Sequence, residues 1–300
     1  MDNSLMRCAM RFTQGVRRLL TLVCLTVVAT TAQASSVWKV SSGDNVLYLG
    51  GTVHVLRQQD YPLPVEFDRA YLRADRLVFE TDLAQLRTTD VQQRMQRAIR
   101  YGDGSDLSQR ISAGLYQRLA TIWQQYGLPV EALNGLRPSG IVITLTMLNL
   151  KQIGVDAQGI DDYYHSRAVK EGKPVSGLET VDQQIGFLAT MGEGDEETFM
   201  RMSLDELDEA ATFVDDILAA WRQGDLDGLE HLIVEDMRRE SPAQYQTLLV
   251  GRNQHWMPQI KAMLRDRPVE FVLVGSGHLA GDEGLIKQLQ LAGYQVERLQ

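Results

Sequence analysis

Length, composition and charge place this chain among ordinary globular proteins. It has 300 residues, of which 44% are hydrophobic and 23% charged, enough for one large domain or two small ones. This composition argues against a disordered or collagen-like chain. The formal net charge of −9 argues against sequence-independent nucleic-acid binding, which needs basic residues to neutralise phosphates. We therefore expect no nucleic-acid partner.

The first 34 residues have the pattern of a secretory signal peptide. A stretch that holds four arginines precedes an uncharged apolar run over residues 19–29, and small residues follow at Ala32 and Ala34. The run is shorter than the ~20 residues that span a bilayer, so an uncleaved anchor is the weaker alternative. We expect cleavage after Ala34, a single domain over residues 35–300, a periplasmic or secreted location and no stable membrane anchor.

Both cysteines, Cys8 and Cys24, lie in this predicted leader. Its removal would leave no cysteine and change the net charge from −9 to −12, because the leader carries four arginines and one aspartate. A disulfide-free exported protein depends on its hydrophobic core for stability. Without a thiol, any bound metal must be held by histidine and carboxylate ligands.

The predicted elements begin with a hairpin and a strand–helix–strand unit. Residues 37–40 and 45–50 are expected to be strands joined by a turn, and the second runs into Gly51-Thr-Val-His54. Residues 64–74 have the apolar spacing of a helix, and residues 76–80 are typical of a short strand that ends in Glu80. This order predicts parallel pairing at this point of a sheet.

The middle of the chain, residues 90–265, is predicted to be mostly helical. Helices are expected over 108–125, 138–150, 159–170, 180–190, 198–222 and 241–264, with a short strand at 173–178. The apolar helix over 138–150 is too short to span a membrane and is expected to be buried. Six acidic residues between 205 and 216 are expected to form a solvated helix surface.

The end of the chain repeats the pattern of its beginning. A strand over 269–274 leads into Gly275-Ser-Gly-His278, and a helix over 284–291 and a strand over 294–299 follow. Both ends are thus strand, Gly-x-x-His, helix and strand, which suggests an internal duplication. The predicted fold class is α/β, with two related strand–GxxH–helix–strand halves that flank a large helical insertion.

The two Gly-x-x-His elements predict a shared site. Ligands of open α/β sheets bind at the carboxyl ends of the strands, where His54, His278 and Glu80 are expected. Two imidazoles and a carboxylate suit a divalent metal with an open coordination position, which would activate water for hydrolysis. One such motif usually marks an ordinary loop histidine, but two of the five histidines share this context. His165 is expected to be structural.

Further short motifs extend this pattern along the whole chain. They are Leu49-Gly-Gly-Thr-Val-His54, Phe79-Glu80, Gly159-Ile-Asp161, Gly172-Lys-Pro-Val-Ser-Gly-Leu-Glu-Thr180 with Gln183 or Gln184 after it, Gly251-Arg-Asn253 and Val274-Gly-Ser-Gly-His-Leu279. In order and spacing they resemble the TraB/PrgY/GumN family, whose animal members are the Tiki proteases. The resemblance covers the chain from Val37 to its end.

The resemblance implies an α/β fold similar to erythromycin esterase and ChaN-like proteins. It also implies a metal-dependent peptidase that uses Mn²⁺ or Co²⁺ and acts on a peptide or protein substrate. His54, His278 and Glu80 match the proposed active-site residues, with Glu80 as metal ligand or general base.

Four further residues match the family motifs with less defined roles. Arg252 would stabilise an oxyanion or hold a substrate carboxylate, or else form an ion pair with Glu179 or Glu80 that orients the metal ligands. Glu179, Asn253 and Asp161 would support the metal ligands or bind substrate, and Glu179 has a purely structural role as its alternative.

Two other functions remain open on the same residues. The cleft could bind a peptide, haem or a metal without turnover. Alternatively, a metal-free esterase-like hydrolase could use one histidine as general base and Glu80 to orient it. The three hypotheses differ in whether products form and in whether chelation stops the reaction.

Overall fold

A six-stranded mixed sheet forms the centre of the protein. The computed structural model describes residues 35–300, so the predicted leader lies outside the described residues. The strands lie in the order β6-β4-β7-β2-β1-β8. Their bounds are β1 Val37–Ser42, β2 Asn45–Thr52, β4 Arg76–Phe79, β6 Val175–Gly177, β7 Glu270–Gly275 and β8 Gln295–Arg298. A separate short ladder pairs β3 (Val55–Leu56) with β5 (Ala157–Gln158).

Within this sheet, β1 runs against the other five strands. It pairs antiparallel with β2 and β8, whereas β2, β7, β4 and β6 pair parallel in succession. The predicted hairpin and the predicted parallel pairing are both confirmed. Because parallel strands end at the same edge of a sheet, β2, β4 and β7 all deliver the residues that follow them to one edge.

The two predicted halves share a strand direction but differ in layout. The link from β2 through α2 (Val65–Arg73) to β4 passes over one strand, β7. The link from β7 through α14 (Leu285–Leu291) to β8 passes over two, β2 and β1. The structure thus shows a mixed α/β fold with a central sheet and many helices, while the duplication and the erythromycin esterase-like halves stay predictions.

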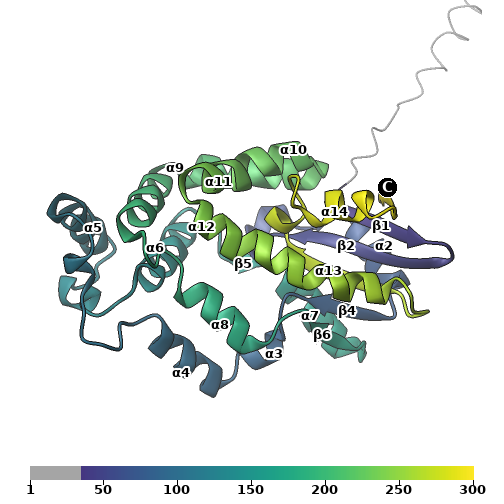
Figure 1. Ribbon diagram of the computed structural model, residues 1–300, viewed down its shortest axis with the longest axis horizontal. Helices are drawn as coiled ribbons and strands as arrows, with labels where there is room; N and C mark the ends of the chain where they lie inside the picture. The colour runs from purple at the N-terminus through teal and green to yellow at the C-terminus, as the bar shows by residue number, and fades with distance from the viewer. Residues whose placement is uncertain (1–34) are drawn as a thin grey trace, which may run out of the picture. The chain divides into compact units, whose positions relative to one another are not determined.

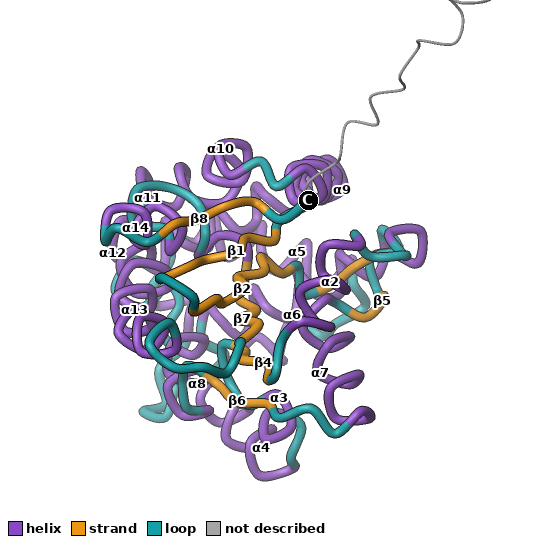
Figure 2. Tube along the Cα trace, turned by 90° about the vertical axis from the view of Figure 1, so that its right-hand side faces the viewer, coloured by secondary structure: helices purple, strands orange, loops and turns teal. Residues whose placement is uncertain are grey.

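Helices cover both faces of the sheet (Figure 2). Alternate residues of a strand point to opposite faces. In β7, Phe271 and Leu273 pack in one core with residues of α2 and α7 (Ile160–Glu171), whereas Val272 and Val274 pack in the other with α13 (Gly251–Met263) and α14. This two-sided burial explains why β7 is an uninterrupted apolar run after Glu270.

The middle of the chain is helical, as predicted, and lies beside the sheet (Figure 1). Its remaining helices are α3 (Leu83–Leu86), α4 (Thr89–Ala98), α5 (Ala113–Gln125), α6 (Pro138–Gln152), α8 (Val181–Ala189), α9 (Glu196–Gln223), α10 (Leu226–Leu229), α11 (Asp236–Glu240) and α12 (Pro242–Tyr245). Across residues 35–300, no helix combines the length and apolar character needed to cross a bilayer.

Two predicted helices differ by more than two residues from the structure. α5 starts at Ala113 because the Ser112 hydroxyl caps it by accepting a hydrogen bond from the backbone N–H of Leu115. The expected single helix over 241–264 is divided into α12, a π-helical turn over Gln246–Val250 and α13. Wide π turns of this kind recur at functional sites, and this one is followed directly by the buried Arg252 and Asn253.

Candidate functional site

The carboxyl ends of β2, β4 and β7 bring His54, Glu80 and His278 to one point beside Gly275. A Cβ atom added to Gly275 would lie 3.3 Å from Glu80 Oε1, 3.7 Å from His278 Cδ2 and 3.8 Å from His54 Nε2. A side chain at this position would occupy the space that the three groups face. The glycine therefore keeps the site open, and the three residues predicted from the sequence lie together.

Glu80 is fixed by a hydrogen bond to each carboxylate oxygen. Its Oε1 accepts the backbone N–H of Gly275 at 2.7 Å, and its Oε2 accepts Nη2 of Arg252 at 2.6 Å. Burial alone would raise the pKa of Glu80, but the neighbouring His278, the Arg252 charge and the Gly275 N–H outweigh it and lower this pKa to about 2. Glu80 is therefore ionised at neutral pH.

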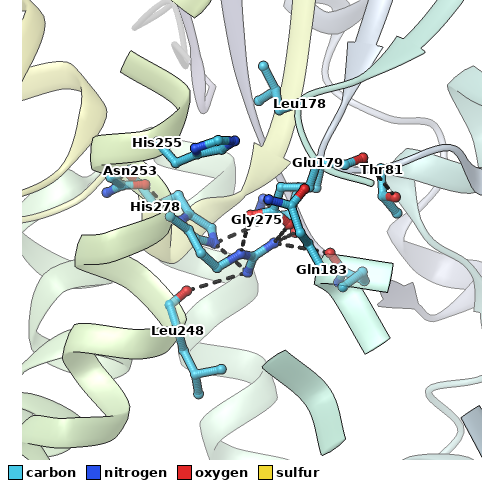
Figure 3. Close-up of polar contacts among 12 residues, drawn as sticks. Thr81, Leu178, Glu179, Gln183, Leu248, Asn253, His255, Gly275 and His278 are labelled. Atoms are coloured by element: carbon cyan, nitrogen blue, oxygen red, sulfur yellow. Dashed lines mark hydrogen bonds and ion pairs between the residues drawn. The ribbon is translucent and has the colours of Figure 1, made fainter. Parts of the chain in front are cut away.

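Arg252 joins most of the site through its guanidinium. Nε and Nη2 form a bidentate pair with the Glu179 carboxylate, at 2.8 and 2.9 Å. Nη1 lies 3.1 Å from Nε2 of His278 and 3.4 Å from the Leu248 carbonyl oxygen (Figure 3). Burial lowers the pKa of Arg252, but its carboxylate partners outweigh this and raise it. Of the two roles considered for Arg252, the structure shows the ion pairs with Glu179 and Glu80.

His278 is held in one tautomer by Asn253. The amide nitrogen of Asn253 donates to the carbonyl oxygens of His278 and Glu283, at 3.1 and 2.9 Å, so its Oδ1 must be an acceptor. Oδ1 lies 2.8 Å from Nδ1 of His278, which therefore carries the proton. Burial, together with the Arg252 charge, lowers the pKa of His278 to about 3. The ring is neutral at pH 7, and its Nε2 lone pair accepts from Arg252.

His54 is paired with Asp161 through its other ring nitrogen. Nδ1 of His54 lies 2.9 Å from Oδ2 of Asp161, and the His54 side chain is 68% exposed. The Asp161 charge raises the pKa of His54 to about 9, although solvent around the exposed ring weakens this attraction. A base or ligand role for Nε2 therefore requires the imidazolium to lose a proton.

The Gly159-Ile-Asp161 motif explains how Asp161 reaches His54. A Cβ at Gly159 would collide with the backbone carbonyl of His54, so a glycine is needed where the two segments touch. The N–H of Ile160 donates to the Val53 carbonyl at 3.1 Å, which fixes the start of α7 against the end of β2. Asp161 lies in the first turn of that helix.

The side-chain atoms at the site are of the types that bind divalent metals. Two imidazole nitrogens and a carboxylate oxygen are common ligands, and each imidazole is anchored through Nδ1 as metal-binding histidines are. With Arg252 positive, Glu80 and Glu179 negative and His278 neutral, this buried set has a net charge of −1, which attracts a cation.

The arrangement described is nevertheless not that of an assembled metal centre. Among residues 35–300, no group of three or more His, Asp or Glu side chains has the spacing of a metal site. In this arrangement Nε2 of His278 instead accepts a hydrogen bond from Nη1 of Arg252. Metal binding would require the guanidinium to release His278.

Several contacts at the site were not predicted from the sequence. The Trp256 ring lies 4.4 Å from the His278 ring between centroids and 4.8 Å from the guanidinium carbon of Arg252. Gln184 accepts from Arg252 at 3.2 Å, whereas Gln183 caps α8. A usable signal existed for Trp256, because it follows Arg252 by four residues and so lies on the same face of α13. His165, expected to be structural, is buried against Phe79.

Comparisons with known proteins agree with the family resemblance of the sequence. The chain is 24% identical over 265 residues to the uncharacterised protein YbaP of Escherichia coli, which covers 83% of this chain and 89% of YbaP. It is also 24% identical over 302 residues to the metalloprotease TIKI2 of Danio rerio, again over 83% of this chain but only 58% of TIKI2. No solved structure gave a significant match. The model of the TraB/PrgY/gumN family matches residues 36–298. This chain therefore belongs to the TraB/PrgY/gumN family.

Proposed function

We propose that this protein is a metal-dependent hydrolase that cleaves peptide bonds. The observation that carries the proposal is the convergence of His54, Glu80 and His278 on the open point beside Gly275. The similarity to a relative named as a metalloprotease supports this choice over other hydrolases. The same family resemblance favours Mn²⁺ or Co²⁺ as the ion.

In this proposal His54, His278 and Glu80 would hold the metal. A bound divalent ion lowers the pKa of water and polarises a carbonyl group. Asp161 and Asn253 keep the two Nε2 atoms directed toward the site by holding Nδ1 of each ring.

Glu80 and Arg252 have separate tasks in the proposed reaction. Glu80 is ionised and buried beside the open point, so it can act as metal ligand or accept a proton from an attacking water. The guanidinium of Arg252 already contacts Glu80, Glu179, Gln184, His278 and the Leu248 carbonyl. We therefore assign Arg252 to positioning Glu80 rather than to binding an oxyanion.

We further propose that the protein acts in the periplasm or after secretion. The support is the basic, apolar and Ala-x-Ala pattern of residues 1–34. A substrate met there would be an exported peptide or protein.

The pairing of His54 with Asp161 favours a second candidate. A histidine that is exposed and held by a buried carboxylate at 2.9 Å can act as a general base without a metal. In such a metal-free hydrolase Asp161, and not Glu80 as expected from the sequence, would orient the base. A binding protein without turnover would use the same residues and release no product.

The proposal is tested by metal analysis and peptide cleavage on one preparation. The purified protein is stripped with chelator, reloaded with Mn²⁺ or Co²⁺, and incubated with a peptide library whose products are identified by mass spectrometry. Cleavage that appears on reloading and disappears on chelation is expected. Cleavage that survives chelation supports the metal-free candidate, and tight metal or peptide binding without products supports a binding protein.

A further inference from the structure

An apolar cavity of about 390 Å³ opens beside His54. Its size lies in the usual range for ligand pockets, ~300–1,000 Å³. Twelve of its sixteen lining residues are apolar, and they come from α6, α9, the chain next to His54 and, at Val155, the segment after α6. His54 itself forms part of the wall, so the cavity and the candidate site are continuous.

Part of this lining is apolar surface that the protein leaves uncovered. The helix over 138–150 was predicted to be buried, but Met147 of α6 is 53% exposed and Phe213 of α9 is 36% exposed. Both residues line the cavity, whereas Val155 and Leu218 in the same wall are almost fully buried. Covering exposed apolar surface of this kind with an apolar guest is favourable. The prediction that this helix is buried holds for Ile141 and Leu145 but not for Met147.

The charges around the cavity disfavour an anionic guest. Glu206 is the only carboxylate among the described residues that line it, no lysine or arginine is present, and the raised pKa of His54 adds positive charge only at the end next to the candidate site. Glu206 also lines a neighbouring cavity of about 370 Å³, whose wall holds two further acids, Glu209 and Asp236. A carboxylate that entered beside Glu206 would meet like charge on this side. The occupant that fits is an uncharged apolar group.

We infer that this cavity is the subsite for a bulky apolar side chain of the substrate, next to the bond that is cleaved. The inference rests on the proposed function, because it places the peptide backbone at His54 and Glu80. It predicts a preference for substrates with phenylalanine, leucine or methionine beside that bond, and discrimination against acidic residues there.

The test measures peptide binding, so it does not depend on turnover. Fluorescently labelled Ala-Ala-X-Ala-Ala peptides, with X as Phe, Ala or Glu, are titrated against the chelator-treated protein, and mass spectrometry checks that they stay intact. If a peptide is cleaved, kcat/KM replaces the dissociation constant. The cavity is filled by Ala210→Phe, and Ala211→Phe, at the exposed next position of α9, is the matched control.

The Phe peptide is expected to bind about tenfold or more tightly than the Ala and Glu peptides. Ala210→Phe should remove this preference and Ala211→Phe should keep it. If Ala210→Phe does not fold, Met147→Glu at the exposed rim should weaken binding of the Phe peptide instead.

Three results would overturn the inference. The first is equal affinity for the three peptides, and the second is a preference for the Phe peptide that both cavity variants leave intact. The third is that lauric acid binds more tightly than the Phe peptide and that Ala210→Phe abolishes this binding. The last would identify an acyl-chain site. Selective binding of the Phe peptide without any cleavage in the presence of Mn²⁺ or Co²⁺ would contradict the proposed function while leaving the subsite in place.

Discussion

Nδ1 of His278 donates a hydrogen bond to Oδ1 of Asn253 across 2.8 Å. The direction of this bond follows from the other end of the same side chain, whose nitrogen donates to two backbone carbonyls. The Asn253 amide thereby determines that the lone pair of His278 lies on Nε2, where it accepts a hydrogen bond from Nη1 of Arg252. The Asn253 side chain thus determines which ring nitrogen of His278 is available to accept a hydrogen bond or a ligand.

Replacement of Asn253 by alanine should lower activity and stability together. Loss of the Nδ1 contact releases the tautomer, which we expect to reduce kcat/KM by about 10–100-fold. The buried carbonyls of His278 and Glu283 would lose their donor, which should destabilise the fold by about 1–3 kcal/mol. Thermal unfolding and peptide cleavage measure the two effects. Gln254→Ala, at the exposed next residue, is the control, and equal behaviour of the two variants would contradict this role.

Arg252→Gln should be among the most destabilising single changes in the site. It would leave the carboxylates of Glu80 and Glu179 buried without their cation, and breaking such a pair costs about 3–5 kcal/mol. The free energy of unfolding in urea measures this loss. A second change, Glu179→Gln, should restore part of it by removing one of the unpaired charges. A loss below about 1 kcal/mol for Arg252→Gln would show that the pairs are not formed.

The low pKa of His278 predicts acid sensitivity of the fold. Below pH 6.5 the unfolded chain binds a proton on residue 278, and the folded protein does not until about pH 3. Stability attributable to His278 therefore falls as the pH drops below 6.5, by up to about 1.4 kcal/mol per pH unit. Glu80 adds a loss of the same sign between pH 4.5 and 2.

The loss of stability at acid pH is measured as the free energy of unfolding in urea between pH 4.5 and 6.5, where Glu80 contributes little. His278→Gln should flatten the dependence by about one proton relative to the unmodified protein. Identical slopes in the two proteins would mean that His278 titrates normally in the folded state. His54 acts in the opposite sense, because its raised pKa contributes stability that is lost as the pH rises from 6.5 through about 9.

Asp161→Asn should bring the pKa of His54 down from about 9 toward its ordinary 6.5, because the Asp161 charge is the largest cause of the increase. An NMR titration of the His54 ring measures this directly. Asp162→Asn is the matched control, since the next residue of α7 pairs with Arg87 instead. An unchanged His54 titration in Asp161→Asn would exclude the pairing in solution.

The parts of the fold that follow from local periodicity were predictable from the sequence. Local sequence encodes the two-residue alternation of strands and the spacing of apolar residues in helices. These patterns predicted the hairpin, the parallel strand–helix–strand unit and the positions of His54, Glu80 and His278 directly after strands. Their meeting at one edge then follows from how parallel strands end. The motif that contains Asp161 was recognised in the sequence, but its pairing with His54 was not predicted, because this contact depends on how α7 packs against the end of β2.

The rest depends on tertiary packing. The π turn before Arg252 could not be predicted from local sequence. An ion pair of Arg252 with Glu179 or Glu80 was one of the two roles considered from the sequence, but that it forms with both residues depends on how α13 approaches the ends of β4 and β6. The exposure of Met147 on α6 was also not predicted, because the sequence of an apolar helix does not indicate which of its residues other elements cover.

The claim that His54, Glu80 and His278 form one hydrolytic site is tested most directly by comparing peptide cleavage in four proteins. These are the unmodified protein and the variants His54→Ala, Glu80→Gln and His278→Ala, each with Mn²⁺ and with products identified by mass spectrometry. We predict that the unmodified protein releases products and that each variant is slower by at least about 100-fold. Equal cleavage by all four proteins would contradict the claim, because the three residues would then have no part in the reaction.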